Sequence, residues 1–113
     1  MSKQYKIVRA STKSFSSLLK IDKVQVTDLT DWTCFIQLRN KKNKKITGSV
    51  DREVTTKNQT NTNFVITLTN TETDINEDDY ILGVEYRNTV TGQVIEDPDN
   101  IVEIKVVEGW VYG

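Results

Sequence analysis

The feature that most constrains this chain is an alternation of side chains with a period of two. From Trp32 to Leu38 apolar residues occupy every second position, and the run then breaks into a turn, 40–45, before Ile46 resumes it. Successive side chains of a strand point to opposite faces of a sheet. The pattern therefore predicts two half-buried strands joined as a hairpin.

The same period recurs along most of the chain, and no stretch has the i, i+3, i+4, i+7 spacing of an amphipathic helix. Further strands are expected at 5–9, 18–21, 24–26, 46–54, 64–68, 80–86, 94–95 and 102–106. The serine-rich stretch 11–17 is expected to be a loop or bend, and the segment 71–74 has the Thr-x-x-acid form that permits a single helical turn. About seven to nine short strands with turns between them predict an all-β sandwich.

Tyr80 makes the expected fold more specific. It follows an acidic turn and lies two residues before Leu82, and Trp32 opens what would be the third strand. In immunoglobulin domains a tyrosine at this point bonds back to the turn, and a core cysteine follows two residues later. We therefore expect an immunoglobulin-like β-sandwich of antiparallel strands with aliphatic packing in place of the disulfide. A plain core tyrosine is the alternative.

Length and charge limit the classes of function. The chain has 113 residues, which suits a single domain spanning 1–113. Its 15 basic and 16 acidic residues give a net charge of −1, which argues against a general binder of nucleic acid or of anionic membranes. The start has no apolar segment of signal-peptide length, and nothing approaches a membrane span. We expect a soluble protein made in a cytoplasm, with no nucleic-acid or membrane partner.

The residues that carry most enzyme chemistry are missing or have a simpler explanation. The sequence contains no histidine, the usual general base near neutral pH. Cys34, the single cysteine, is expected to pack in the core, and the alternative is an activated nucleophile. The acidic stretches 74–79 and 96–99 are expected to be solvated turns, with a shared Ca²⁺ site as the alternative. We expect no enzyme, no cofactor and no metal.

Two groups of residues are candidates for binding a partner. The first group lies in the turn after the Trp32 strand and comprises Lys41, Lys42, Lys44 and Lys45. Such a charged tip protects strand edges from pairing, and it can also seat in an acidic groove of a neighbouring protein. The second group is Trp110 and Tyr112, in a docking tail at 108–113. These aromatic residues can instead extend the last strand and cap the core.

The order of the segments resembles one known family. The quoted runs are DLTDWTCFIQLR at 28–39, FVITLT at 64–69 followed by Glu72-Thr73, DYILGVEY at 79–86, TGQVI at 91–95 and VEIKV at 102–106. They are similar to the N-terminal immunoglobulin-like domain of phage baseplate upper proteins, and the resemblance covers nearly the whole chain. Two departures are the acidic stretch 76–79, where that family commonly has Pro-Gly, and the lack of a long fibre-forming segment after the sandwich.

The resemblance implies a structural protein of a bacteriophage virion. We expect a non-catalytic module for capsid decoration, head fibre, neck, tail or baseplate attachment, which docks onto other phage virion proteins and self-associates. A module that binds glycans or a host surface through the loop Asn58–Asn63 is the alternative function. An enzyme is a third reading and would need a reactive Cys34 or paired carboxylates in a deep pocket.

Overall fold

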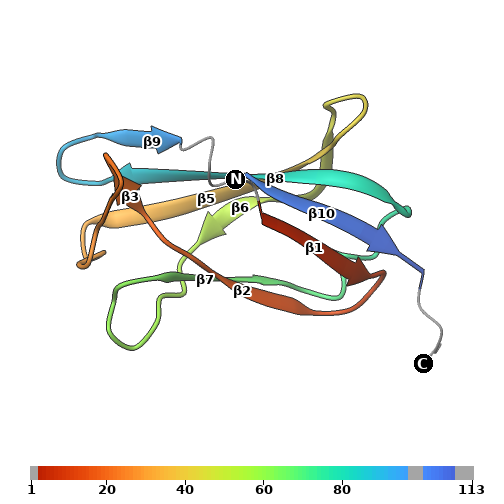
Figure 1. Cartoon of the computed structure of the whole chain (residues 1–113), viewed down its shortest axis with the longest axis horizontal. Helices are drawn as coiled ribbons and strands as arrows, with labels where there is room; N and C mark the ends of the chain where they lie inside the picture. Colours follow the sequence, from red (N-terminus) through yellow and green to blue (C-terminus); the bar gives the residue numbers. More distant parts are fainter. Residues whose placement is uncertain (1–2, 97–100, 109–113) are drawn as a thin grey trace.

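The structure is a computed structural model that describes residues 3–96 and 101–108, and within them it contains strands and no helix (Figure 1). No helix of these residues is therefore long and apolar enough to cross a membrane. The strands are β1 (Lys3–Val8), β2 (Lys13–Ser17), β3 (Lys20–Ile21), β4 (Val24–Gln25), β5 (Trp32–Asn40), β6 (Ile46–Val54), β7 (Phe64–Leu68), β8 (Asp78–Asn88), β9 (Val94–Glu96) and β10 (Val102–Val107).

The larger of the two layers is a sheet with the strand order β1-β10-β8-β5-β6, in which β9 also pairs with β8. The hairpin expected after Trp32 is present as β5 and β6, with a register shift between Gln37 and Arg39. Every pairing in this sheet is antiparallel except that of β1 with β10, which is parallel. The expectation of antiparallel strands throughout is therefore wrong for the first strand, because β1 enters the sheet beside the last strand and runs in its direction.

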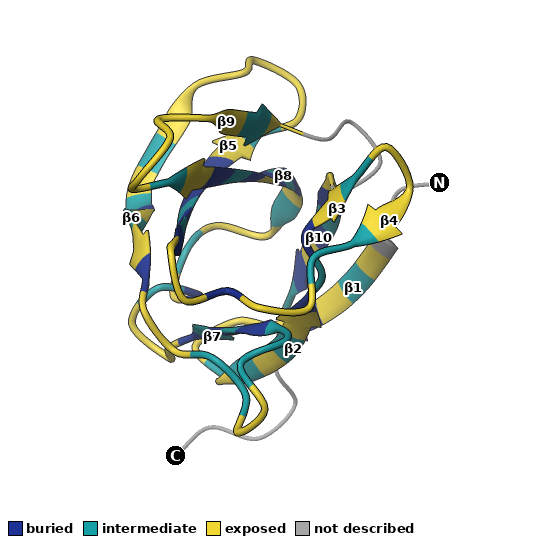
Figure 2. Cartoon of the chain, turned by 90° about the vertical axis from the view of Figure 1, so that its left-hand side faces the viewer, coloured by how far each residue is buried: buried dark blue, intermediate teal, exposed yellow. Residues whose placement is uncertain are grey.

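The second layer consists of the antiparallel pair β2 and β7, with the small hairpin β3–β4 beside the same core. The inward side chains of both layers form one cluster, and Figure 2 shows the buried residues on the inner surfaces. From β5 the cluster receives Trp32, Cys34, Ile36 and Leu38, so the alternation read in the sequence is confirmed. The architecture is an immunoglobulin-like β-sandwich.

The tyrosine corner expected from the sequence is present. Tyr80 lies at the start of β8, and its hydroxyl donates a hydrogen bond to the backbone carbonyl of Asn76 at 2.6 Å. Leu82, two residues later, is completely buried, as expected for an aliphatic residue in the place of the core cysteine. The corner ties the turn between β7 and β8 to the start of β8.

Replacing Tyr80 with phenylalanine should lower the free energy of unfolding by about 1 kcal/mol, because the Asn76 carbonyl loses its donor while the ring stays packed. Urea denaturation measures the change. Tyr5→Phe is the matched control, since the Tyr5 ring stacks on Phe15 at 4.9 Å and no hydrogen bond of its hydroxyl occurs among the described residues. An equal loss in both variants would contradict the role of the corner.

Two local expectations are wrong. The serine-rich stretch 11–17 is not a loop throughout, because Lys13–Ser17 forms β2, whose Phe15 turns inward while the serines on either side are exposed. The link 72–79, expected to hold a single helical turn, contains no helix, and the i→i−4 backbone bond from the Thr73 amide to the Thr69 carbonyl at 3.0 Å closes a turn that begins earlier, at Thr69. The reciprocal capping pair is instead Thr69 and Glu72, in which the Thr69 amide donates to the Glu72 carboxylate at 3.0 Å and the Glu72 amide donates to the Thr69 hydroxyl at 3.2 Å.

Candidate functional site

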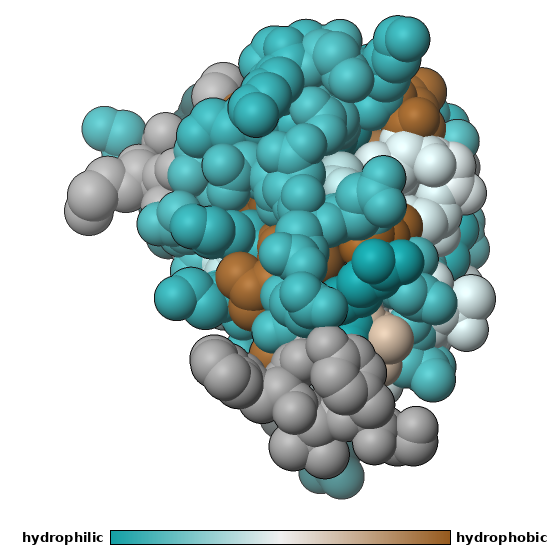
Figure 3. Space-filling view, turned by 90° about the vertical axis from the view of Figure 1, so that its right-hand side faces the viewer, coloured by the Kyte–Doolittle hydropathy of each residue, from teal (hydrophilic) through white to brown (hydrophobic). Residues whose placement is uncertain are grey.

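The four lysines expected at a hairpin tip lie together at the turn between β5 and β6. Lys41, Lys42, Lys44 and Lys45, named here the basic tip, are all exposed. The Lys41 ammonium lies 3.3 Å from the Glu103 carboxylate. Among the described residues the other three ammonium groups make no ion pair within 4 Å. Figure 3 looks onto this end of the sandwich, whose surface is mostly hydrophilic.

The backbone of the basic tip is held by hydrogen bonds. The Asn40 side-chain carbonyl accepts from the amides of Lys42 at 2.9 Å and Asn43 at 3.3 Å. The Asn43 side-chain oxygen accepts from the Lys45 amide at 2.9 Å. Asparagine side chains that bond nearby amides are a usual way to fix a turn. A tip fixed in this way loses less conformational entropy when it binds a partner.

The turn is also anchored to the rest of the sandwich. The Lys41 amide donates to the Asp79 carbonyl at 2.9 Å, and the Asn40 side chain donates to the Asp78 carboxylate at 3.1 Å. The Asp79 amide donates to the same Asp78 carboxylate, and these bonds hold the pKa of Asp78 below its ordinary value. The position of the basic tip is thus set by the start of β8.

The other predicted partner-binding residues, Trp110 and Tyr112, lie outside the described residues. The expectation that they form a docking tail at 108–113 stays a prediction. Of that segment only Glu108 is described, and it is exposed.

Cys34 is a core residue, as expected. Its side chain is completely buried, and burial raises the pKa of the thiol to about 12, with a smaller contribution from the nearby charge of Glu53. A thiolate is the reactive form of cysteine. A completely buried thiol with a raised pKa lacks the exposed setting that an activated nucleophile needs, which favours the core-packing interpretation.

The two acidic stretches do not meet within the described residues. Asp78 and Asp79 begin β8, whereas Glu96 ends β9 and pairs across from Glu85, further along β8. Residues 97–99 of the second stretch lie outside the description. Among the described residues, no group of three or more Cys, Asp or Glu is placed to hold a metal ion.

The polar loop Asn58–Asn63, the candidate for sugar contacts, is bonded mainly within the protein. The Asn58 side chain donates to the Thr60 and Thr62 hydroxyls and accepts from the Thr62 amide at 2.7 Å. The Asn61 side chain donates to the carboxylate of Asp28 at 3.0 Å. Many of the groups that the glycan alternative relies on are therefore already engaged.

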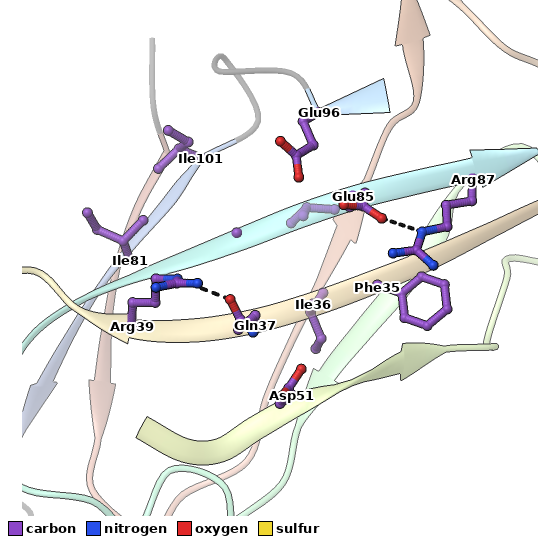
Figure 4. A pocket seen from close by; sticks show the side chains of 12 residues that line it. Phe35, Ile36, Gln37, Arg39, Asp51, Ile81, Glu85, Arg87, Glu96 and Ile101 are labelled. Carbon is purple, nitrogen blue, oxygen red and sulfur yellow. Dashed lines mark hydrogen bonds and ion pairs between the residues drawn. The ribbon is translucent and has the colours of Figure 1, made fainter. Parts of the chain in front are cut away.

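A surface feature that was not expected from the sequence lies on the large sheet. We call the side of this sheet that faces away from the core the outer face. It carries a hollow of about 540 Å³, named here the outer hollow (Figure 4). The residues that line it come from β5, β6, β8, β9 and the residue before β10: Phe35, Ile36, Gln37, Arg39, Asp51, Ile81, Gly83, Val84, Glu85, Arg87, Glu96 and Ile101.

Charged side chains lie around the outer hollow. Arg87 donates to the Glu85 carboxylate, and its guanidinium lies 4.6 Å from the centre of the Phe35 ring. Arg39, on the other side, donates to the Gln37 side chain at 3.0 Å. The Arg87 bond lowers the pKa of Glu85, while the adjacent Glu85 carboxylate raises the pKa of Glu96. The two carboxyl groups therefore lie close together on one side of the hollow.

Gly83 is the signal in the sequence that points to this hollow. A glycine inside a strand often marks a site where another group approaches closely. Gly83 interrupts the outward side chains of β8 between Ile81 and Glu85, which leaves space over the middle of the sheet. The sequence placed this glycine in a strand, but it could not show that β5, β9 and Ile101 surround the gap.

Comparison with known proteins gives likenesses of fold only. No family model matches the chain, and no curated protein matches it. Among solved structures, the ZIG-8–RIG-5 IG1–IG1 heterodimer has a chain with 9% identity and a TM-score of 0.44, with 96% of this chain and 84% of that chain covered.

Two other similar structures concern sodium-channel β subunits. A structure from an analysis of cell-adhesive interactions of VGSC beta subunits has 11% identity and a TM-score of 0.47. The match covers 96% of this chain and 93% of that chain. The voltage-gated sodium channel beta4 extracellular domain has 11% identity and a TM-score of 0.40, with 96% and 92% covered. At such identities a likeness says nothing of function.

Proposed function

We propose that this chain is a non-catalytic attachment module of a bacteriophage particle. It is made in the host cytoplasm and docks onto another virion protein, on the capsid, neck, tail or baseplate. The phage assignment is supported by the sequence resemblance described above. The docking role is supported by the geometry of the basic tip.

The observation that carries the docking role is a fixed cluster of exposed cations. The side chains of Lys42, Lys44 and Lys45 project from a turn whose backbone is held by Asn40 and Asn43. An acidic groove on a partner attracts such a cluster and orients the encounter, even though the net charge of the chain is only −1. The rigid turn lowers the entropy cost of the contact.

The first experiment asks whether the chain belongs to a particle. Mass spectrometry of purified phage particles should detect it at a fixed ratio to a known structural protein. Its absence from every mature particle would overturn the virion assignment. Binding of the purified chain to dissociated virion proteins should then identify the partner.

The double variant Lys42→Glu/Lys44→Glu should weaken binding to that partner at least about tenfold, because it reverses two charges in the contact. The double variant Lys20→Glu/Lys23→Glu is the matched control. Lys23 and Lys44 both have a left-handed backbone, with φ of 68° and 63°, so both variants place one glutamate in that conformation. Equal binding by the two variants would contradict docking through the basic tip.

The same binding assay tests the predicted tail. A chain truncated after Glu108 lacks Trp110 and Tyr112, and weaker binding by this chain would support their role as anchors. A glycan array with the unmodified chain tests the alternative function. Specific binding to one glycan class that is lost on changing Asn58–Asn63 would favour the glycan-binding module.

A further inference from the structure

Two lysines on the large sheet continue the positive charge of the basic tip. Lys105 on β10 pairs with Asp79 on β8 and, on its other side, with Lys6 on β1. Both lysines are exposed, whereas their chain neighbours Ile7 and Val106 are buried, so the two lysines point to the outer face. Figure 1 shows the ends of β1 and β10 at the same end of the sandwich as the turn after β5.

Backbone and side-chain contacts connect these lysines to the basic tip. The Asp79 carbonyl accepts from the Lys41 amide at 2.9 Å, and the Lys41 ammonium reaches β10, where it lies 3.3 Å from the Glu103 carboxylate. The Arg39 guanidinium donates to the Lys44 carbonyl at 3.0 Å, so a further cation lies against the tip. We call the tip and its continuation on the sheet the basic band, which comprises Lys6, Arg39, Lys41, Lys42, Lys44, Lys45 and Lys105.

The cations that the sheet adds to the band are not neutralised within the domain. Among the residues that the structure describes, Lys6, Arg39 and Lys105 have no carboxylate within 4 Å. Arg39 donates instead to a side-chain amide oxygen and to a backbone carbonyl. Like charges on neighbouring strands repel, so the adjacent Lys6 and Lys105 are a cost to the isolated domain. An anionic partner would relieve this repulsion.

Two carboxylates within the basic band indicate which kind of anion fits it. Asp79 and Glu103 lie among the lysines on the outer face. A nucleic acid presents a continuous row of phosphates, which these carboxylates repel. An acidic protein segment has separate carboxylates, and it can place a polar or basic side chain opposite Asp79 and Glu103. The net charge of −1 likewise gives a long polyanion no long-range attraction.

We propose that the basic band is one continuous docking site for an acidic segment of a partner protein. The proposal rests on the proposed function, since it extends the contact of the basic tip onto β10 and β1. The band crosses three gaps between neighbouring strands, from β5 through β8 and β10 to β1, or about 14 Å. An extended segment of about five residues spans this width. Lys6 and Lys105 therefore add to the affinity that the tip provides.

The decisive variant neutralises the part of the band that lies on the sheet. Lys6→Gln/Lys105→Gln removes two charges and also the repulsion between β1 and β10, so it should fold at least as stably as the wild type. Lys20→Gln/Lys23→Gln is the matched control. Both of its lysines are exposed, make no ion pair among the described residues, and belong to the β3–β4 hairpin at the other end of the sandwich (Figure 1).

Fluorescence anisotropy with a labelled hexaglutamate peptide measures binding by the purified chain at low ionic strength. We expect the dissociation constant to rise at least about threefold in Lys6→Gln/Lys105→Gln but not in Lys20→Gln/Lys23→Gln, and to rise with added NaCl. Circular dichroism of each variant confirms the fold. Equal binding by the two variants, or no binding of the peptide by the unmodified chain, would overturn the proposal.

A labelled oligothymidylate of the same length tests the class of partner. Tighter binding of the oligothymidylate than of hexaglutamate would overturn the assignment of a protein segment.

Failure of this proposal can be told apart from failure of the proposed function. If Lys42→Glu/Lys44→Glu weakens binding of hexaglutamate but Lys6→Gln/Lys105→Gln does not, the basic tip docks alone and only the extension onto the sheet is overturned. Absence of the chain from every particle overturns the virion assignment and leaves the result with the peptide unchanged.

Discussion

Replacing Phe64 with alanine should lower the free energy of unfolding by about 3–5 kcal/mol. The Phe64 side chain is completely buried, and its ring centre lies 5.7 Å from that of Tyr86 on the opposite sheet. The Lys57 ammonium lies 5.6 Å from the same ring. Removal of the ring leaves a cavity between the two layers that the surrounding strands fill only in part. Urea denaturation followed by circular dichroism measures the loss.

Val65→Ala is the matched control for this variant. Val65 is the next residue of β7 and points to the other side of its sheet, where it is only half-buried. Its loss should stay below about 1 kcal/mol. Similar losses in both variants would contradict the position of Phe64 at the centre of the sandwich.

Replacing Glu72 with glutamine should cost about 1–3 kcal/mol near neutral pH, because its carboxylate joins the two sheets. It accepts hydrogen bonds from the Arg52 guanidinium at 2.7 and 2.9 Å and from the Thr69 amide at 3.0 Å. Arg52 also donates to the Thr67 carbonyl of β7 at 2.8 Å. Since 38% of the Arg52 side chain is exposed, solvent screens the charge and the lower part of the range is expected.

The pH dependence of this effect has a definite sign. Burial by itself raises the pKa of Glu72, but the bonds from Arg52 and Thr69 outweigh it and hold the pKa below the ordinary value of 4.5. The stabilisation is therefore present above pH 4.5 and is lost as the pH falls through the lower pKa of the folded state. The difference between wild type and Glu72→Gln should accordingly shrink in acid.

Thermal or urea unfolding at several pH values tests this expectation. Glu77→Gln is the control, because Glu77 is exposed and makes no ion pair among the described residues. The lowered pKa values of Asp28 and Asp78 act in every variant alike and cancel in the comparison. A Glu72→Gln difference that stays constant between neutral pH and pH 3 would contradict the ion pair as the cause.

Much of the candidate site was predictable from local sequence. The turn after Asn40 and its four lysines were expected, because a polar, asparagine-containing segment between two alternating runs is a turn. The burial of Cys34 followed from its place in the alternation. The outer hollow was not predictable, because its walls come from β5, β6, β8 and β9, which are distant in the chain.

The misassigned serine-rich stretch shows where local pattern fails. Lys13–Ser17 has one large apolar residue, Phe15, so its sequence resembles a loop. Pairing with β7 makes it a strand, and the Ser17 hydroxyl is bonded to the Tyr86 hydroxyl inside the core. Long-range pairing here outweighs weak local preference, as is usual for strands.

The sequence by itself determined which side of each clear strand is buried, because successive side chains point in opposite directions and only one set is apolar. It also indicated the corner at Tyr80, whose hydroxyl bonds a carbonyl four residues away, although it left a plain core tyrosine as the alternative. Only the tertiary structure decided that β1 lies parallel to β10 and that residues of β5, β6, β8 and β9 surround the outer hollow. Those features depend on which strands become neighbours, and contacts between residues far apart in the chain determine that choice.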